Sequence, residues 1–233
     1  MLNQIKHRII LFNLIKDIYQ SQLGLYLGFK GGTMAYFFYE LNRFSVDLDF
    51  DLLDETKKTL ISYFMPSILK KYGEIIEKRD KFYTYFYLLS YKKEQRQIKI
   101  EISKRNTLSS YIISNFYGVD VKIQKIEDAF ATKLLACTTR NKIAYRDFYD
   151  VLFYLKKGII PNQEVIKKIT NKDLGDYLKD LKSLIEKKVS NQLVLQSIGE
   201  LIDEKQKNFI KTQFKTELIN RLSFFIDQVN KFN

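Results

Sequence analysis

The chain has 233 residues, a formal net charge of +12 at pH 7 and an isoelectric point near 9.4. Apolar residues make up 45% of it, which is enough for a folded core, and its single cysteine excludes an internal disulfide. No apolar run approaches the ~20 residues of a membrane helix, and Met1 to Ile18 lacks the apolar core of a signal peptide. We therefore expect a cytoplasmic protein without a membrane partner.

The positive charge favours a polyanionic partner such as nucleic acid, which lysine and arginine bind through phosphate contacts. The alternative is that the lysine content reflects an AT-rich genome rather than a function. The lone histidine, His7, excludes any site with several histidine ligands.

Apolar periodicity predicts an α/β first half followed by a helical second half. In chain order we expect a helix over 4–22, a strand over 25–29, a helix from Met34 to about Leu41, a strand over 45–52, a helix over 55–72, and strands over 82–91 and 97–103 joined by a turn at 92–96. Helices are then expected over 125–140 and 146–157, the latter closed by Gly158, with two or three more over 163–230.

A glycine-rich turn, Lys30, Gly31, Gly32 and Thr33, separates the first strand from the helix after it. Glycines let the backbone approach a phosphate, and the N-terminus of the following helix supplies free N–H groups and a positive dipole. The Thr33 hydroxyl can donate to a phosphate or cap the helix that is expected to begin at Met34. The alternative is an ordinary strand–turn–helix connection.

Acidic residues lie on one face of two alternating strands. Asp47 and Asp49 are two residues apart, so both side chains are expected on one face of the strand over 45–52. Two such carboxylates can hold a pair of Mg²⁺ or Mn²⁺ ions, and Glu101 is a third ligand if its strand lies beside theirs. Asp51 lies one step further along the same face. The alternative is a set of solvated surface acids.

Two polar residues before the aspartates and one lysine in a later helix complete the candidate site. Arg43 and Ser45 are candidates for nucleotide binding, and Arg43 could instead be a surface cation. Lys133 stands among the small and apolar residues Ala129, Ala136 and Cys137, so it is not on a solvent face. Such a lysine needs an anionic partner, which a triphosphate would supply, unless its amine reaches out to the helix edge.

Together these motifs resemble the AbiEii/AbiGii toxin family of nucleotidyltransferases, within the polymerase-beta-like superfamily. The resemblance rests on the Lys-Gly-Gly-Thr turn, on Arg-Phe-Ser-Val-Asp-Leu-Asp-Phe at 43–50, on a lysine helix at 126–140 and on an Arg-Asp-x-x-Asp helix at 146–152. It implies a small mixed, twisted sheet with helices over 1–120 as the catalytic domain. It also implies a helical domain over 121–233 that completes the active-site cleft.

The resemblance implies a role for each matching residue. Asp47 and Asp49 would be catalytic and bind Mg²⁺ or Mn²⁺, and Lys133 would contact the triphosphate. Asp147 would be the later catalytic or structural acid, with Asp150 as the competing choice. From the residues alone, Asp147 could instead cap its helix and pair with Arg140 or Arg146.

Family members of this type are toxins of bacterial toxin–antitoxin or phage-defence systems, and some transfer nucleotides to the 3′ end of tRNA. The resemblance therefore implies an NTP substrate, a cognate antitoxin protein and a tRNA or other RNA acceptor, with pyrophosphate as the leaving group. One alternative is a nucleotidyltransferase with a protein or small-molecule acceptor, such as an aminoglycoside. Another is a non-catalytic domain that binds a nucleotide or a partner.

Overall fold

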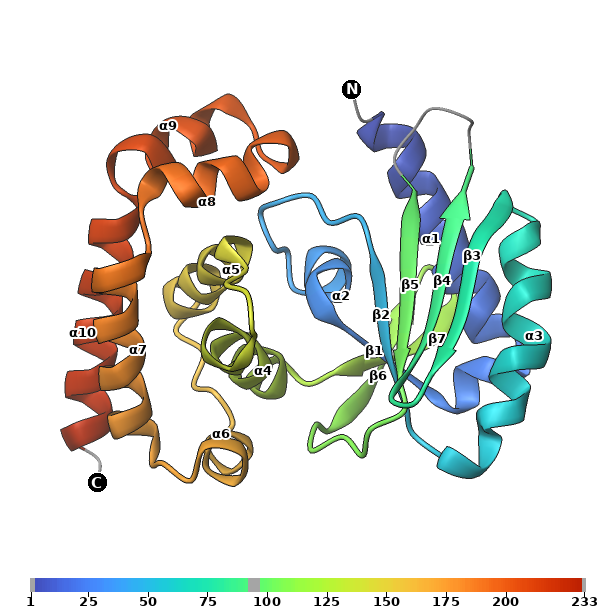
Figure 1. The fold of residues 1–233 in the computed structure, drawn as a ribbon, viewed down its shortest axis with the longest axis horizontal. Coiled ribbons are helices and arrows are strands. Elements are labelled where there is room, and N and C mark those ends of the chain that lie inside the picture. Colours follow the sequence, from blue (N-terminus) through green and yellow to red (C-terminus); the bar gives the residue numbers. More distant parts are fainter. Residues whose placement is uncertain (1–2, 92–96, 232–233) are drawn as a thin grey trace. The chain divides into compact units, whose positions relative to one another are not determined.

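The computed structural model describes residues 3–91 and 97–231. The chain forms two compact units. The first comprises residues 1–40 and 44–125, and the second comprises residues 41–43 and 126–233. Figure 1 colours the first unit from blue to green and most of the second from yellow-green to red. The short segment 41–43 thus interrupts the first unit and belongs with the helices that follow it.

The first unit is built on one mixed sheet, which confirms the expected fold class. Its seven described strands are β1 Leu27–Lys30, β2 Leu48–Leu52, β3 Glu74–Lys81, β4 Thr84–Ser90, β5 Ile98–Ser103, β6 Tyr111–Phe116 and β7 Val119–Gln124. They are ordered β3-β4-β5-β2-β1-β7-β6. The β1–β7 and β2–β5 pairs are parallel and the other pairs are antiparallel.

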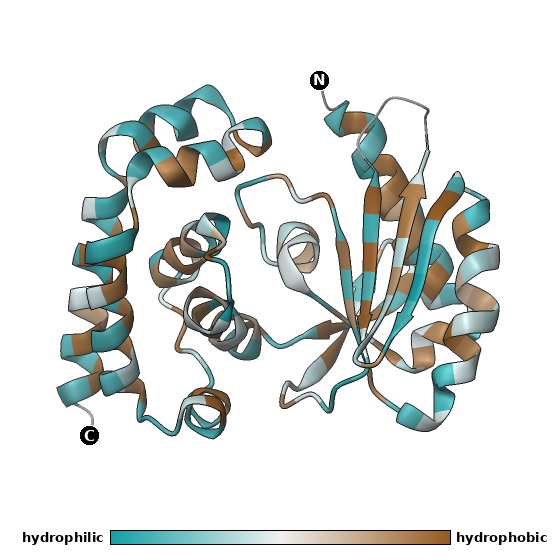
Figure 2. Ribbon diagram, viewed as in Figure 1, coloured by the Kyte–Doolittle hydropathy of each residue, from teal (hydrophilic) through white to brown (hydrophobic). Residues whose placement is uncertain are grey.

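Alternation along the strands creates a buried face and a more polar face. Leu48, Phe50, Ile98, Ile100 and Ile102 are all fully buried, while the residues between them are more polar (Figure 2). The helices of this unit are α1 Gln4–Gln20, α2 Gly31–Phe38 and α3 Lys58–Lys70, with 3₁₀ turns at Gln22–Leu25 and Glu55–Lys57. Helices α1 and α3 cover one face of the sheet, and α2 lies against the other (Figure 1).

Three strands differ from the expectation. The first strand begins at Leu27 because Gln22–Leu25 is a 3₁₀ turn, and β2 begins at Leu48, so Asp47 precedes it. β4 covers only part of the strand expected over 82–91, since Phe82 and Tyr83 form a turn. The expected turn at 92–96 lies outside the described residues, although β4 and β5 pair antiparallel as a hairpin would.

Sequence periodicity missed β3, β6 and β7. β3 and β6 are the edge strands of the sheet, and the half-exposed or exposed residues along most of each give no alternating pattern. An edge strand is held in the sheet by backbone pairing with one neighbour, and the charged side chains of β3 limit its pairing with other chains. β7 continues the sheet to Gln124, beyond the point where strand signals were expected to stop.

The second unit is helical. Its helices are α4 Ile126–Thr139, α5 Tyr145–Lys156, α6 Gln163–Thr170, α7 Leu174–Lys188, α8 Asn191–Ile198, α9 Glu204–Thr212 and α10 Phe214–Lys231, with a 3₁₀ turn at Gly199–Leu201. Five helices therefore occupy the region where two or three were expected. Local capping explains the extra breaks, because the side chains of Asn162, Ser190 and Asp203 accept backbone N–H bonds at three helix starts.

Helix α5 is the centre of the second unit. It packs against α4, α8 and α10, and its residues from Asp147 to Leu155 are all buried. Gly158 follows it with φ +67°, which confirms the expected glycine at the end of this helix. In the described part of the chain, no helix is long and apolar enough to cross a membrane.

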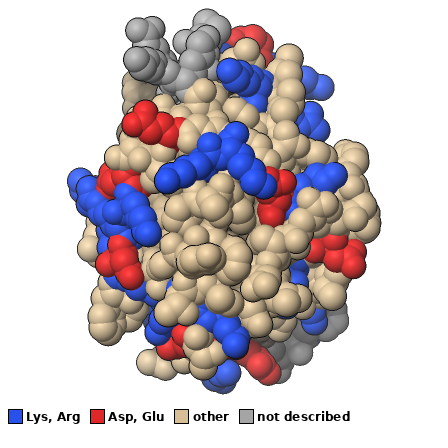
Figure 3. All heavy atoms as spheres, turned by 90° about the vertical axis from the view of Figure 1, so that its right-hand side faces the viewer, with Lys and Arg blue, Asp and Glu red and all other residues tan. Residues whose placement is uncertain are grey.

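Charge on the α3 side of the first unit is mixed. Lysine and arginine side chains gather there in several groups, with acidic side chains between them and broad uncharged areas around them (Figure 3). The net charge of +12 is therefore not concentrated in a uniformly basic patch on this face.

Candidate active site

The glycine turn lies directly against Asp49. Helix α2 begins at Gly31, not at Met34, and its N-cap is Lys30, whose side chain makes no capping bond. Gly31 has φ +83°, and a Cβ there would lie 2.5 Å from the Asp49 Oδ2 atom. Only glycine combines this positive φ with the absence of a side chain that would collide with Asp49. The carboxylate of Asp49 therefore lies at the positive N-terminal end of α2, where free backbone N–H groups also favour a phosphate.

Thr33 fixes the segment that carries Asp47. It lies in the first turn of α2 and is not the expected cap. Its buried hydroxyl lies 2.9 Å from the Ser45 Oγ atom and also bonds to the backbone carbonyl of Asp47. Thr33 and Ser45 were both candidates for nucleotide binding, but in this structure they hold each other and the approach to β2.

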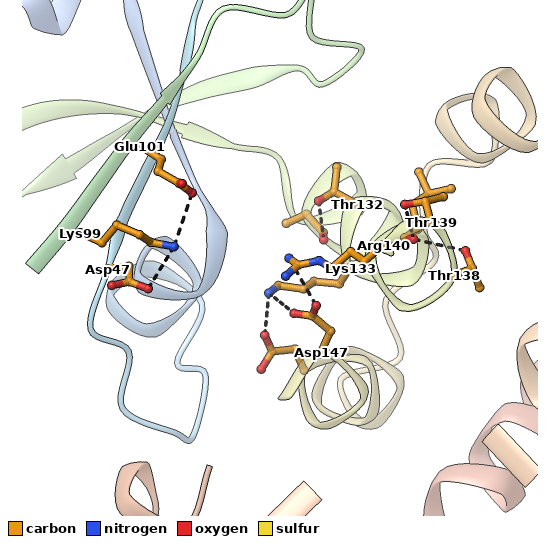
Figure 4. Close-up of polar contacts among 12 residues, drawn as sticks. Asp47, Lys99, Glu101, Thr132, Lys133, Thr138, Thr139, Arg140 and Asp147 are labelled. Carbon is orange, nitrogen blue, oxygen red and sulfur yellow. Dashed lines mark hydrogen bonds and ion pairs between the residues drawn. The ribbon is translucent and has the colours of Figure 1, made fainter. Parts of the chain in front are cut away.

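Asp49 and Glu101 lie side by side on the polar face of the sheet, and Asp47 lies just before the start of β2. Asp49 on β2 is directly opposite Glu101 on the parallel strand β5. The Lys99 amine points between two of the carboxylates, 3.6 Å from Asp47 Oδ2 and 3.4 Å from Glu101 Oε2 (Figure 4). The parallel β2–β5 pairing thus brings together acids that are more than fifty residues apart in the sequence.

The chemistry of this acidic group suits a divalent cation. Its carboxylate oxygens are the hard ligands that Mg²⁺ and Mn²⁺ prefer. The ammonium of Lys99 already places a positive charge between Asp47 and Glu101. Among the described residues, no three acidic, histidine or cysteine side chains are close enough to hold a metal as they stand. The carboxylates thus match Mg²⁺ in ligand type but not in their present spacing, and the Lys99 ammonium occupies the position between Asp47 and Glu101.

Asp51 and Lys30 form a separate, partly buried contact on the same face. The Lys30 amine lies 2.5 Å from Asp51 Oδ1, and the Tyr111 hydroxyl donates to Asp51 Oδ2 at 2.5 Å. Burial, together with the charge of Asp51 and this hydrogen bond, raises the pKa of Tyr111 well above its usual value. The ring of Tyr111 also covers Gly28, where a Cβ would lie 2.3 Å from it. Lys30, expected at the phosphate, is thus paired with Asp51.

Sequence reasoning did not select Tyr111 or Lys99 for this site. Lys99 could have been found, because it stands two residues before Glu101 on an alternating strand and so shares its face. Tyr111 carries no comparable signal, since it belongs to the unrecognised edge strand β6.

A buried charge cluster forms in the second unit. Arg43 is only 4% exposed, and its Nε and Nη2 atoms donate to the two carboxylate oxygens of Asp150 at 2.6 and 2.8 Å. The Lys133 amine lies 2.8 Å from Asp150 Oδ2 and 3.0 Å from Asp147 Oδ1. The alternative that Arg43 is a surface cation is therefore wrong.

Both acids of the Arg-Asp-x-x-Asp segment face Lys133. Asp147 is fully buried in the first turn of α5, whose N-cap is Ala144. Its Oδ2 atom has no hydrogen-bond partner among the residues that the structure describes, but the Arg140 guanidinium lies 3.4 Å away (Figure 4). The Lys133 side chain is only 14% exposed, in keeping with its apolar neighbours, and it finds its anionic partners within the protein. Buried Cys137 lies on the same helix, and burial raises the pKa of its thiol well above its usual value.

The two cations of this cluster lower the pKa of the Asp150 carboxyl. Burial by itself raises the pKa of the Asp150 carboxyl, but Arg43 and Lys133 lower it to about 2 through their charges and hydrogen bonds. Burial also lowers the pKa of Lys133, and the two carboxylates raise it above its usual value overall. Asp150, Lys133 and Arg43, whose pKa is also raised, are therefore ionised near neutral pH.

We expect the protein to lose stability as the pH falls from about 4 towards 2. The pKa of Asp150 is 3.8 in its ordinary state and about 2 when folded, so its contribution is complete above 3.8 and vanishes as the pH drops through 2. Linkage gives this contribution a size of about 2 kcal/mol. Urea unfolding of the wild type and of Asp150→Asn between pH 5 and pH 2 measures it. An equally steep fall in the variant would contradict the assignment.

Comparison with known families identifies the chain as a nucleotidyltransferase. The chain matches the family described as "Nucleotidyl transferase AbiEii toxin, Type IV TA system" over residues 13–227. It therefore belongs to the AbiEii nucleotidyltransferase toxin family, whose members act in type IV toxin–antitoxin systems. No curated protein matches the chain.

Two solved structures share the fold. A Helicobacter pylori protein assigned as a nucleotidyltransferase is 22% identical, with a TM-score of 0.69, and the alignment covers 100% of this chain and 99% of that one. JHP933 from Helicobacter pylori is 21% identical, with a TM-score of 0.59 and the same coverage of both chains. At such identities the likeness establishes the fold over the whole chain.

Proposed function

We propose that this toxin transfers a nucleoside monophosphate from an NTP to the 3′-terminal hydroxyl of tRNA. Pyrophosphate is the leaving group, and the new phosphodiester bond joins the acceptor oxygen to the α-phosphorus. The proposed setting is the cytoplasm, where NTPs and tRNA are available, and the proposed partner is the antitoxin that the toxin–antitoxin family implies.

The main support is the position of Asp49 beside the start of α2. The close approach at Gly31 puts an anionic ligand group and the phosphate-binding end of a helix at the same point on the sheet. A nucleoside triphosphate with a bound cation needs both features, since the N–H groups hold phosphate oxygens and the carboxylate holds the cation. A domain that only bound a partner protein would not need this arrangement.

Asp47, Asp49 and Glu101 would hold Mg²⁺ or Mn²⁺. When bound, such an ion polarises the acceptor hydroxyl and neutralises charge on the phosphates. Lys99 keeps Asp47 and Glu101 close to each other, and Thr33 holds the backbone at Asp47. The backbone N–H groups of Gly31 and Gly32 would bind the triphosphate.

Lys133 would contribute its charge to triphosphate binding, as the family resemblance implies. Asp147 and Asp150 hold its amine in place within the second unit. In this proposal Asp147, Asp150 and Arg43 are positioning residues, because each of them acts through Lys133 or through another member of the buried cluster.

Incubation of the purified protein with total tRNA, Mg²⁺ and one α-³²P-labelled NTP at a time tests the proposal. We expect label on tRNA with a preferred NTP, and none with the Asp47→Asn/Asp49→Asn variant. Periodate oxidation of the tRNA 3′ end should also prevent labelling. Label that appears only on protein, or only on an aminoglycoside, would replace tRNA with that acceptor, and no transfer to any of them would refute the proposal.

A further inference from the structure

The polar face of the sheet continues outward from Glu101 to the edge strand. Phe86 on β4 is directly opposite Glu101 on β5, and Arg79 on β3 is directly opposite Phe86. Lys81 lies opposite Thr84 on the same pair of strands. Residues opposite each other in a sheet point to the same face. Arg79, Lys81 and Phe86, here called the β3–β4 track, therefore share a face with Glu101.

The track combines an aromatic ring with two exposed cations. Phe86 is half-buried, whereas its neighbours Tyr85 and Tyr87 point into the core. The Lys81 amine lies 5.2 Å from the centre of the Phe86 ring, and exposed Arg79 pairs with Glu77 at its own strand edge. An aromatic platform beside exposed cations is how proteins bind single-stranded nucleic acid, through base stacking and phosphate contacts.

Further groups of the same kind lie at the tip of the β3–β4 hairpin. Phe82 is 84% exposed and Tyr83 is 50% exposed. The Arg105 guanidinium, just beyond β5, lies 4.7 Å from the centre of the Tyr83 ring. The combination of an exposed aromatic ring and a cation is therefore repeated at the tip of this hairpin.

We propose that the β3–β4 track binds the single-stranded end of the acceptor RNA. A base near the acceptor end stacks on Phe86, and Arg79 and Lys81 contact the phosphates beside it. Neighbouring strands are about 4.8 Å apart, so Arg79 lies roughly 10 Å from Glu101, a distance that a nucleotide or two can span. This assignment rests on the proposed RNA acceptor, and continuity with the carboxylate face and the positive charge favour RNA over a protein partner.

Two variants of the 233-residue chain test the track. Their affinity for tRNA is measured without NTP, so that no nucleotide transfer can take place. Arg79→Gln/Lys81→Gln changes only exposed side chains, and Phe86→Leu keeps an apolar side chain but removes the ring. We expect each to weaken tRNA binding about tenfold. The double variant should also lower the slope of log affinity against log salt by about 1.4, because two single-strand phosphate contacts are lost. KM for the NTP should stay unchanged.

Two control variants replace exposed residues that do not lie on the face of the sheet that carries the β3–β4 track. Lys78→Gln alters the same strand, but Lys78 is opposite Tyr87 and so points to the other face. Tyr63→Ala removes an exposed ring from α3. Both should bind tRNA like the wild type.

The outcomes separate the two proposals. If the wild type labels tRNA and the track variants bind tRNA with unchanged affinity and salt dependence, the track assignment is wrong while the proposed function stands. If the variants bind tRNA normally but no longer bind the co-expressed antitoxin, the surface belongs to that protein and the assignment is also wrong. If the wild type neither binds nor labels RNA, the RNA acceptor itself is refuted, and the track assignment fails with it.

Discussion

Asp49→Asn is expected to reduce nucleotidyl transfer by about a thousandfold or more while the protein stays folded. Asparagine has nearly the same shape as aspartate, so it preserves the close contact with Gly31. It removes the negative charge by which Asp49 would hold the proposed divalent cation at the start of α2. Single-turnover transfer from a labelled NTP measures the loss, and circular dichroism with thermal unfolding measures the fold.

The control for this experiment is Asp120→Asn. Asp120 is an exposed strand aspartate on β7, so its replacement removes the same charge from the same sheet without touching the carboxylate group. We expect wild-type transfer from it. Transfer by Asp49→Asn at the wild-type rate would mean that the carboxylates on β2 and β5 are not the catalytic group.

Arg43→Met is expected to destabilise the protein by about 3–5 kcal/mol, because it leaves the fully buried Asp150 with only part of its compensating charge. Methionine fills much of the space of the arginine stem but cannot bond to either carboxylate oxygen. For a chain of this size, the loss corresponds to a melting temperature that is roughly 10 °C lower. Differential scanning calorimetry at pH 7 measures it.

Two further variants distinguish the buried charge from general damage. Arg221→Met removes an exposed arginine whose Nε atom lies 2.9 Å from Glu217, and we expect a change below about 1 kcal/mol. The double variant Arg43→Met/Asp150→Leu removes both buried charges, so it should recover part of the stability lost by Arg43→Met alone. If the double variant is less stable than Arg43→Met, the unpaired charge of Asp150 is not the reason why Arg43→Met is destabilised.

Local signals in the sequence were enough for much of the fold. The strand over Ile98–Ser103 and helices such as α4 and α5 follow from apolar periodicity, because a half-buried strand or helix must repeat its apolar residues at its own period. Apolar periodicity did not predict the elements whose position depends on backbone pairing between strands or on capping of helix ends. The charged edge strand β3 exists because its backbone pairs with β4, and the breaks among α6 to α9 follow caps that a periodicity scan does not weigh.

For the candidate site, too, the sequence predicted some features and only the tertiary structure determined others. The sequence by itself determined the family and the low exposure of Lys133, and it predicted a role for the paired aspartates, since these depend on residue type and short spacing. Only the tertiary structure decided which groups meet. The parallel β2–β5 register sets Glu101 opposite Asp49, Lys99 enters between the acids, and Arg43 pairs with Asp150 across more than a hundred residues. Such contacts depend on strand order and on the exclusion of water around buried charges, which no local pattern of residues records.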